Sequence, residues 1–209
     1  QITVHKRGGE AKFLHVLPTL WFRNTWSWGE GAPRPELRAG QGMIAARHAD
    51  LGDWFLHCGE IADGAAAQGA AKSARLLFTE NETNKERIWN QPNRSPYVKD
   101  GIHRCVIQGQ QEAVNPQGTG TKAAAHYLIT IGPGQAQRIC LRLNRATGGT
   151  PMFGPEYDEV LPTRKGEADG FYAGITPPSL GTVGVRLMRQ AVAGMLWWPQ
   201  YSYYVFGVW

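Results

Sequence analysis

The sequence lacks the marks of several large classes of protein. It contains no run of about 18 apolar residues, which a membrane-spanning helix requires. It has no Cys-x-x-Cys or His-x-x-x-His pair, so a metal site is not supported. It also has no Gly-x-Ser-x-Gly motif and no phosphate-binding loop. The sequence therefore predicts no metal, no organic cofactor and no nucleophilic triad.

Charge and cysteine are too thinly spread to define a partner or a disulfide framework. The net charge is +5, but the 22 Lys and Arg residues are scattered along the chain. Nucleic-acid binding needs a basic stripe and is disfavoured. The three cysteines, Cys58, Cys105 and Cys140, are odd in number and widely spaced. That spacing favours reduced thiols and a cytoplasmic location.

What the chain does contain is typical of a folded protein built from many short elements. Of its 209 residues 42% are apolar and 19% are charged, which excludes a disordered chain. The 26 glycines and 13 prolines suit short strands joined by turns. The first residue is Gln1 rather than Met, and it leads directly into an alternating strand pattern. We therefore expect a fragment of a larger protein.

Residues 17–29 form the stretch that we expect to organise the domain, and they begin at the end of a strand predicted at residues 11–22. Apolar side chains occupy both alternating faces of a predicted strand here. A strand that is apolar on both faces is usually covered on both, so it is predicted at the middle of a layered domain. One face carries Phe13, Leu17 and Trp21, and the other carries Leu14, Val16, Leu20 and Phe22.

A cluster of binding-type side chains follows this strand. Arg23, Asn24, Trp26 and Trp28 lie within six residues. Two indoles beside an amide and a guanidinium can stack on a sugar ring and hydrogen-bond its hydroxyls. The same residues are equally typical of a core corner or of a contact with another domain, since Trp is a high-burial residue. Both interpretations stay open at this point.

The other strands are predicted at residues 2–6, 43–47, 53–58 and 75–79. Residues 7–10 are expected to join the first strand to the central one as a hairpin. A second hairpin is expected between residues 123–131 and 135–143, with its turn at Gly132-Pro133-Gly134. Residues 29–40 and 59–73 are expected to be loops.

A second polar cluster, Glu80-Asn81-Glu82-Thr83-Asn84, follows the apolar strand 75–79. Such a cluster suits a binding or hinge loop. It also suits a helix N-cap, with Asn81 or Thr83 starting a short turn at 84–89. Glu80 and Glu82 are two apart and would share a face, but no spacing places either carboxylate in a cleft. We expect residues 23–28 and 79–84 to lie together at one end of the domain.

The second half of the chain carries the helical patterns. Residues 97–108 have Val98, Ile102, Cys105 and Val106 at helical spacing. After residue 148 two further helices are predicted, the first interrupted at Pro162 and the second starting at Ser179 and ending at Pro199. The tail 201–209 is aromatic and uncharged, which favours self-association. We expect a domain at 1–147 and a helical segment at 148–209.

Long stretches of the chain resemble one family. They include Leu77-Phe78-Thr79-Glu80-Asn81-Glu82-Thr83-Asn84 and the cluster that begins at Leu14. In order they are Ile2–His5, Leu14–Gly29, Leu77–Asn84, Pro92–Gly101, Ala113–Pro116, Gly120–Tyr127, Ile175–Leu180 and Met188–Ala191. Together these stretches resemble the N-terminal part of bacterial glycoside hydrolase family 63-like glucosidases, which are related to mannosylglycerate hydrolases.

The resemblance implies a mainly β fold: a partial antiparallel super-β-sandwich followed by two C-terminal linker helices and then an (α/α)6 barrel. In such enzymes two carboxyl groups of the barrel hydrolyse α-glucosidic bonds with inversion of the anomeric configuration. The barrel would lie beyond Trp209, so no residue here matches a catalytic position and the chain alone is predicted to be inactive. The alternative is a stand-alone carbohydrate-binding or structural β-sandwich. The candidate sugar or interdomain contacts are Arg23, Asn24, Trp26, Trp28, Glu80, Asn81 and Asn84.

Overall fold

The computed structural model describes residues 1–27, 31–61, 72–145 and 152–198. The chain forms two compact units, Gln1–Phe153 and Gly154–Trp209. The first unit is made of antiparallel β-sheets with short helices, and the second contains two helices. The expected mainly β fold with two C-terminal helices is therefore confirmed. The boundary between the units falls a few residues after the expected one at 147.

One layer of the sandwich is a five-stranded antiparallel sheet in the order β11-β6-β5-β4-β8. Strand β4 was not expected, because two prolines precede it and alanine and glycine are two of its five residues. The strand forms because it pairs with β5 on one side and β8 on the other, and its second residue, Leu37, is fully buried. The strands are β4 Glu36–Gly40, β5 Met43–His48, β6 Gly52–Cys58, β8 Thr119–Gly120 and β11 Leu141–Asn144.

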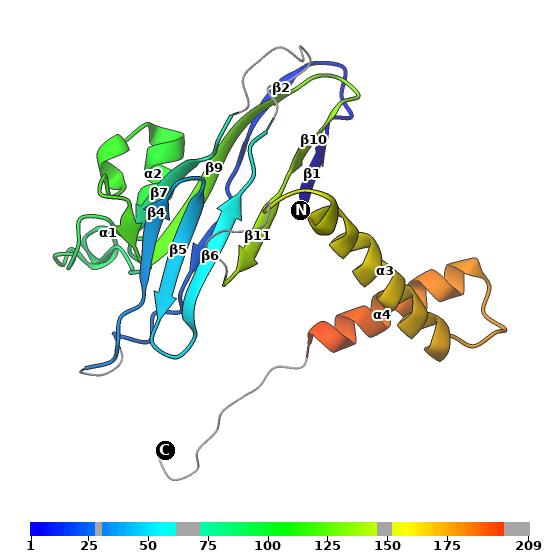
Figure 1. Ribbon diagram of the computed structural model, residues 1–209. Helices are drawn as coiled ribbons and strands as arrows, with labels where there is room; N and C mark the ends of the chain where they lie inside the picture. The colour runs from blue at the N-terminus through cyan, green and yellow to red at the C-terminus, as the bar shows by residue number, and fades with distance from the viewer. Residues whose placement is uncertain (28–30, 62–71, 146–151, 199–209) are drawn as a thin grey trace, which may run out of the picture. The chain divides into compact units, whose positions relative to one another are not determined.

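The other layer is built around β9 (Lys122–Ile131) rather than around residues 11–22 (Figure 1). Strands β2 (Lys12–Val16) and β3 (Thr19–Trp21) both pair with β9, and β7 (Arg75–Thr79) pairs with it as well. The prediction of a covered central strand at 11–22 is thus wrong.

The stretch 11–22 fails as a central strand for a local reason. Pro18 has no N–H to donate, and the strand divides into β2 and β3 around it. The two pieces lie beside β9, where Phe13 is 71% exposed and Trp21 is 55% exposed. In this stretch, apolar residues on both faces therefore belong to strands at the edge of the sheet, where part of their side chains is exposed.

Both expected hairpins are replaced by one long ribbon. Strand β1 (Ile2–His5) pairs with β10 (Ala136–Ile139) and not with β2, while β9 pairs with β2 and not with β10. The two ribbon strands bend together, and the pairing continues through the bend: Lys6 N donates to Gln135 O at 2.9 Å and Gly134 N donates to Lys6 O at 3.0 Å. The chain does turn at the predicted residues 7–10 and 132–134. Instead of closing two hairpins, however, these two segments lie side by side at a bend of one two-stranded ribbon (Figure 1).

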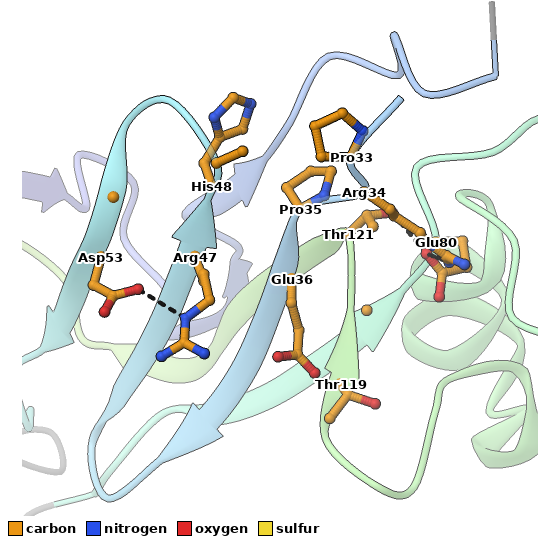
Figure 2. A pocket seen from close by; sticks show the side chains of 13 residues that line it. Pro33, Arg34, Pro35, Glu36, Arg47, His48, Asp53, Glu80, Thr119 and Thr121 are labelled. Carbon is orange, nitrogen blue, oxygen red and sulfur yellow. Dashed lines mark hydrogen bonds and ion pairs between the residues drawn. The ribbon is translucent and has the colours of Figure 1, made fainter. Parts of the chain in front are cut away.

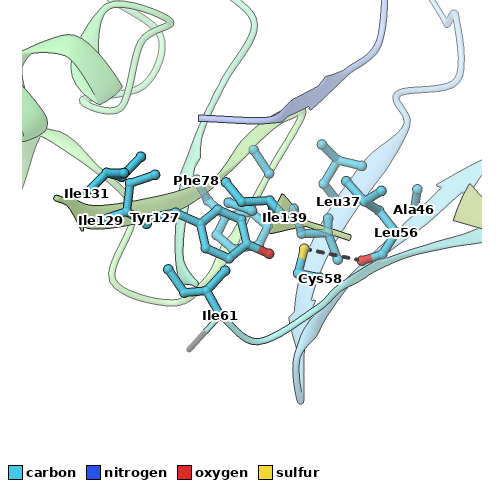
Figure 3. Packing of buried hydrophobic residues seen from close by; sticks show 13 residues of the cluster. Leu37, Ala46, Leu56, Cys58, Ile61, Phe78, Tyr127, Ile129, Ile131 and Ile139 are labelled. Carbon is cyan, nitrogen blue, oxygen red and sulfur yellow. Dashed lines mark hydrogen bonds between the residues drawn. The ribbon is translucent and has the colours of Figure 1, made fainter. Parts of the chain in front are cut away.

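The main core lies between the two layers. Phe78 and Tyr127 from the β9 layer pack in one cluster with Leu37 and Leu56 from the five-stranded sheet (Figure 3). The Tyr127 hydroxyl donates to Gly59 O at 2.9 Å, which satisfies it inside the core. Burial raises the pKa of the neighbouring Cys58 thiol to about 11, so this thiol stays protonated and behaves as a small apolar residue.

A smaller core lies on the other face of the β9 layer, under helix α2 (Gly101–Gln108). Ile102 and Cys105 of α2 pack there with Leu77 and Ala124 of the sheet. The helix begins later than the expected residue 97, but the predicted apolar face is buried. Two short helical turns, α1 (Lys85–Trp89) and a 3-10 turn η1 (Gln111–Ala113), flank it.

The second unit consists of α3 (Pro155–Ile175) and α4 (Thr182–Trp197). Helix α3 continues through Pro162, although an interior proline removes one backbone hydrogen bond, so the expected interruption is wrong. Gly181, not Ser179, precedes α4. Among the described helices, none combines the length and apolar character that a bilayer-spanning segment needs. The aromatic tail 201–209, Pro199 and residues 62–71 lie outside the described residues, so the expectations for them stay predictions.

Truncation of Leu37 is expected to destabilise the sandwich strongly. Leu37→Ala removes a side chain with no exposed area, and such changes cost about 2–5 kcal/mol of unfolding free energy. Leu51→Ala is the matched control, because Leu51 is 52% exposed; it should cost less than about 1 kcal/mol. Urea unfolding followed by tryptophan fluorescence measures both. Equal losses in the two variants would contradict the described core.

A histidine pair links β2 to β9. The His15 Nδ1 and His126 Nε2 atoms lie 2.7 Å apart, and the two ring planes are nearly parallel, 11° apart. One ring must donate and the other accept, so the pair requires at least one neutral imidazole. Desolvation, together with the nearby His15 and Arg75, lowers the pKa of His126.

This pair makes the stability depend on pH. Because the pKa of His126 is lower in the folded state, the unfolded chain binds more protons near the ordinary pKa of about 6.5, and stability falls as the pH drops below it. The wild-type chain should therefore lose more unfolding free energy than His126→Gln between about pH 7.5 and about pH 5.5. His103→Gln, at an exposed position on α2, should keep the wild-type pH profile. A profile unchanged by His126→Gln would refute the assignment.

Candidate functional site

The two polar clusters expected at one end of the domain do lie side by side. Strands β3 and β7 both end against Lys122 at the start of β9, so the segments that follow them leave the sheet together. Asn24 Nδ2 donates to Asn81 O at 3.2 Å, and Asn81 Nδ2 donates to Phe22 O at 2.8 Å. The predicted proximity is confirmed. Two side-chain to backbone hydrogen bonds, one donated from each segment to the other, hold the segments together, and we call them the asparagine lock.

Glu80 opens into a pocket of about 780 Å³, which we name the Glu80 pocket (Figure 2). Its side chain is only 14% exposed and forms an ion pair with Arg34. Thr121 Oγ1 donates to Glu80 Oε2 at 2.7 Å and accepts from Asn81 N at 2.8 Å. The carboxylate is therefore held in place from two sides. The pocket is lined by Pro33, Arg34, Pro35, Glu36, Arg47, His48, Ala49, Gly52, Asp53, Glu80, Thr119, Gly120 and Thr121.

Strand β8 reaches this pocket because of a close backbone approach. A Cβ atom at Gly120 would lie 2.3 Å from the carbonyl oxygen of Thr79. Only glycine lets β8 pass this near to β7. Thr119 and Thr121, on either side of it, are thereby brought to the pocket.

Glu82 lies in a different pocket of about 240 Å³, the Glu82 pocket. The members of its lining are mostly polar: Asn24, Ser27, Glu82, Thr83, Lys85, Trp89, Asn93 and Arg94. An inverting hydrolase needs its two carboxyl groups on opposite sides of one substrate bond. Glu80 and Glu82 open into separate pockets, so they do not form such a pair.

Asn84 is placed in a structural role. Its Oδ1 accepts from Arg87 N at 3.1 Å, as the N-cap of α1, and from Asn93 Nδ2 at 3.1 Å. Its Nδ2 donates to both carboxylate oxygens of Asp100, at 3.2 and 3.1 Å. The expected N-cap at Asn81 or Thr83 is therefore wrong, and the amide of Asn84 has no capacity left for a ligand.

The structure places the aromatic candidates differently from the expectation. The Trp26 Nε1 is buried and has no hydrogen-bond partner among the described residues, so it does not present its N–H to a sugar in solution. Arg23 is exposed, and Trp28 lies outside the described residues. Trp89, which the sequence reasoning missed, is 57% exposed and lines the Glu82 pocket. Its position at the end of the predicted turn 84–89 was the available signal.

Several lining residues of the Glu80 pocket were also missed. Arg47 and Asp53 pair at 3.0 Å across the β5–β6 hairpin. The predicted strands 43–47 and 53–58 already placed them opposite one another, so the hairpin register could have found them. Thr119 could not be found, because β8 is a two-residue strand formed only by its partner β4. No group of three metal-type side chains occurs in the part of the chain that the structure describes.

Fold and pockets together define a β-sandwich with two C-terminal helices and paired polar pockets at one end. No family model matches the chain, and no solved structure matches it. The chain is similar to the "Uncharacterized protein YMR196W" of Saccharomyces cerevisiae, with 30% identity over 234 aligned positions. The alignment covers all of this chain but 22% of the yeast protein, so the chain spans about a fifth of that relative.

Loss of the asparagine lock should loosen the end of the domain. Asn81→Ala removes the donor to Phe22 O, and a lost hydrogen bond of this kind costs about 1 kcal/mol. Amide hydrogen exchange of residues 22–27 is expected to speed up. Thr25→Ala is the control, because it truncates an exposed polar side chain in the same segment. Unchanged exchange in Asn81→Ala would contradict the lock.

Proposed function

We propose that this chain is the non-catalytic sandwich and linker portion of a larger glycoside hydrolase that acts on α-glucosidic bonds. In this role it supports and partly walls the active site of a catalytic barrel that lies outside the chain. The observation that carries the proposal is the lock between Asn24 and Asn81, which holds two polar segments at one end of the sandwich. Residues 14–29 and 77–84, where the resemblance to the glucosidases is longest, contain both segments.

The arrangement of acids supports a non-catalytic role. Glu80 is tied to Arg34 and Thr121, and Glu82 lies in a different pocket. A sandwich that only shapes a neighbouring site needs no pair of carboxylates of its own. The length of the yeast relative is consistent with a segment of this kind being one part of a larger protein.

A stand-alone carbohydrate-binding module is the second candidate, and the Glu82 pocket favours it. Trp89 offers a half-exposed indole face, while Asn24 and Asn93 bring amides to the same pocket. An aromatic face with amide donors is a common means of binding a sugar ring. Cys58, Cys105 and Cys140 are free thiols, which supports a cytoplasmic location for either candidate.

Both candidates predict sugar binding without hydrolysis. The full chain is incubated with aryl α-glucosides and titrated with maltose, with binding read by tryptophan fluorescence. We expect no turnover above buffer and a dissociation constant in roughly the millimolar range, as for a small polar ligand. Trp89→Ala should weaken binding several-fold, whereas Trp21→Ala, of similar exposure but outside both pockets, should not.

Two results would overturn these expectations. Turnover that Glu80→Gln abolishes would show a catalytic centre within the chain. Equal effects of Trp89→Ala and Trp21→Ala would remove the Glu82 pocket from the contact surface. A barrel encoded directly downstream in the same reading frame separates the two candidates, because only the hydrolase portion requires one.

A further inference from the structure

The Glu80 pocket is the larger of the two pockets and has no part in the sugar contact proposed at Trp89. Its volume of about 780 Å³ is within the range of small-molecule sites. It lies between the turn of the β5–β6 hairpin and the segment that precedes β4, and strand β8 closes it on the third side. Each of these elements contributes a polar side chain, so the lining is assembled from distant parts of the sequence.

The charges of this pocket are balanced in pairs. Glu80 is paired with Arg34, and Asp53 is paired with Arg47 (Figure 2). The third carboxylate, Glu36, is paired at 3.0 Å with Arg38, which lies outside the pocket. A ligand therefore need not bring a charge of either sign.

The ion pairs of this pocket leave several donor and acceptor atoms without a partner among the described residues. Within the described part of the chain, Arg47 donates to Asp53 through Nε, and its two terminal nitrogens have no protein partner. Glu80 receives Arg34 and Thr121 at Oε2, which leaves Oε1 as an acceptor. Thr119 Oγ1 accepts from Asn115 Nδ2 at 3.0 Å, so its own hydrogen is available to donate.

His48 adds a donor with a defined tautomer. Its Nδ1 accepts from Asp50 N at 3.1 Å and from Leu51 N at 3.4 Å, so the neutral ring carries its hydrogen on Nε2. The ring also stacks on Phe22 with centroids 5.3 Å apart, which fixes its plane. His48 thus joins the pocket to the strand end that leads into the asparagine lock.

We propose that the Glu80 pocket binds a neutral sugar ring. A ring hydroxyl both donates and accepts, and the pocket offers donors at Arg47, His48 and Thr119 beside an acceptor at Glu80. The rings of Pro33 and Pro35 lie between the two guanidinium–carboxylate pairs in Figure 2 and offer an apolar surface to the C–H face of the sugar. The choice of glucose as the sugar rests on the proposed function, but the pocket chemistry does not.

The test uses the full chain labelled with ¹⁵N and titrated with methyl α-D-glucopyranoside. We expect shifts of the Ala49, Gly52 and Thr119–Thr121 amides with a dissociation constant in roughly the millimolar range. Arg47→Leu, at a surface position, should weaken binding about tenfold, because it removes charge-assisted hydrogen bonds. Arg75→Leu is the control, because Arg75 is an exposed arginine on β7 outside the pocket, and it should leave the affinity unchanged. Thr119→Val removes one hydroxyl at nearly constant volume and should weaken binding as well.

The outcomes at the two pockets separate this inference from the proposed function. Shifts confined to the Glu82 pocket and insensitive to Arg47→Leu overturn the inference and leave the sugar contact at Trp89 intact. Shifts confined to the Glu80 pocket and insensitive to Trp89→Ala support the inference and contradict that contact. Tighter binding of glucose 6-phosphate than of the methyl glucoside overturns the neutral character of the ligand. An equal loss of affinity in Arg47→Leu and Arg75→Leu overturns the assignment to this pocket.

Discussion

The pairing of β9 along both of its edges is the interaction on which the rest of the first unit depends. Near its start one edge bonds to β3 and the other to β7, while further along β2 continues the first edge. The consecutive residues Ala123, Ala124 and Ala125 have no exposed area, because the main core covers one face of β9 and α2 covers the other. Small side chains at this point let the two neighbouring layers approach closely.

This arrangement also determines where the polar pockets form. Since β3 and β7 end opposite the same residue of β9, the segments after them emerge at one end of the sandwich. Thr121, directly before β9, then bonds to both Glu80 and Asn81 and ties the two pockets to the central strand. A buried hydroxyl with two partners is costly to disturb, so the pocket walls share the rigidity of the sheet.

The side chains that line the two pockets are of kinds that can bind a polar ligand. Paired charges and a histidine with a fixed tautomer line one of them, and amides with an exposed indole line the other. Acid–base hydrolysis needs two carboxyl groups across one bond, and the two neighbouring glutamates line different pockets. Under the function proposed above, the sandwich holds and orients a glycan while the reaction takes place on another domain.

The local sequence pattern was sufficient to predict most strands and the buried face of α2, because alternation and helical spacing are properties of a few neighbouring residues. It also predicted that residues 23–28 and 79–84 lie close together, since in both places an apolar strand is followed directly by polar residues. Only the tertiary structure decided that β1 pairs with β10 and that β9, not residues 11–22, is central. Those ladders join residues more than a hundred positions apart, and the same turn sequence permits either a hairpin or a bent ribbon. The Glu80 pocket was also decided only by the tertiary structure. Its walls come from β4, β5, β6 and β8 and from the segments that precede β4 and follow β7, and no local pattern brings Arg34 to Glu80 or Thr119 into the same pocket as Arg47.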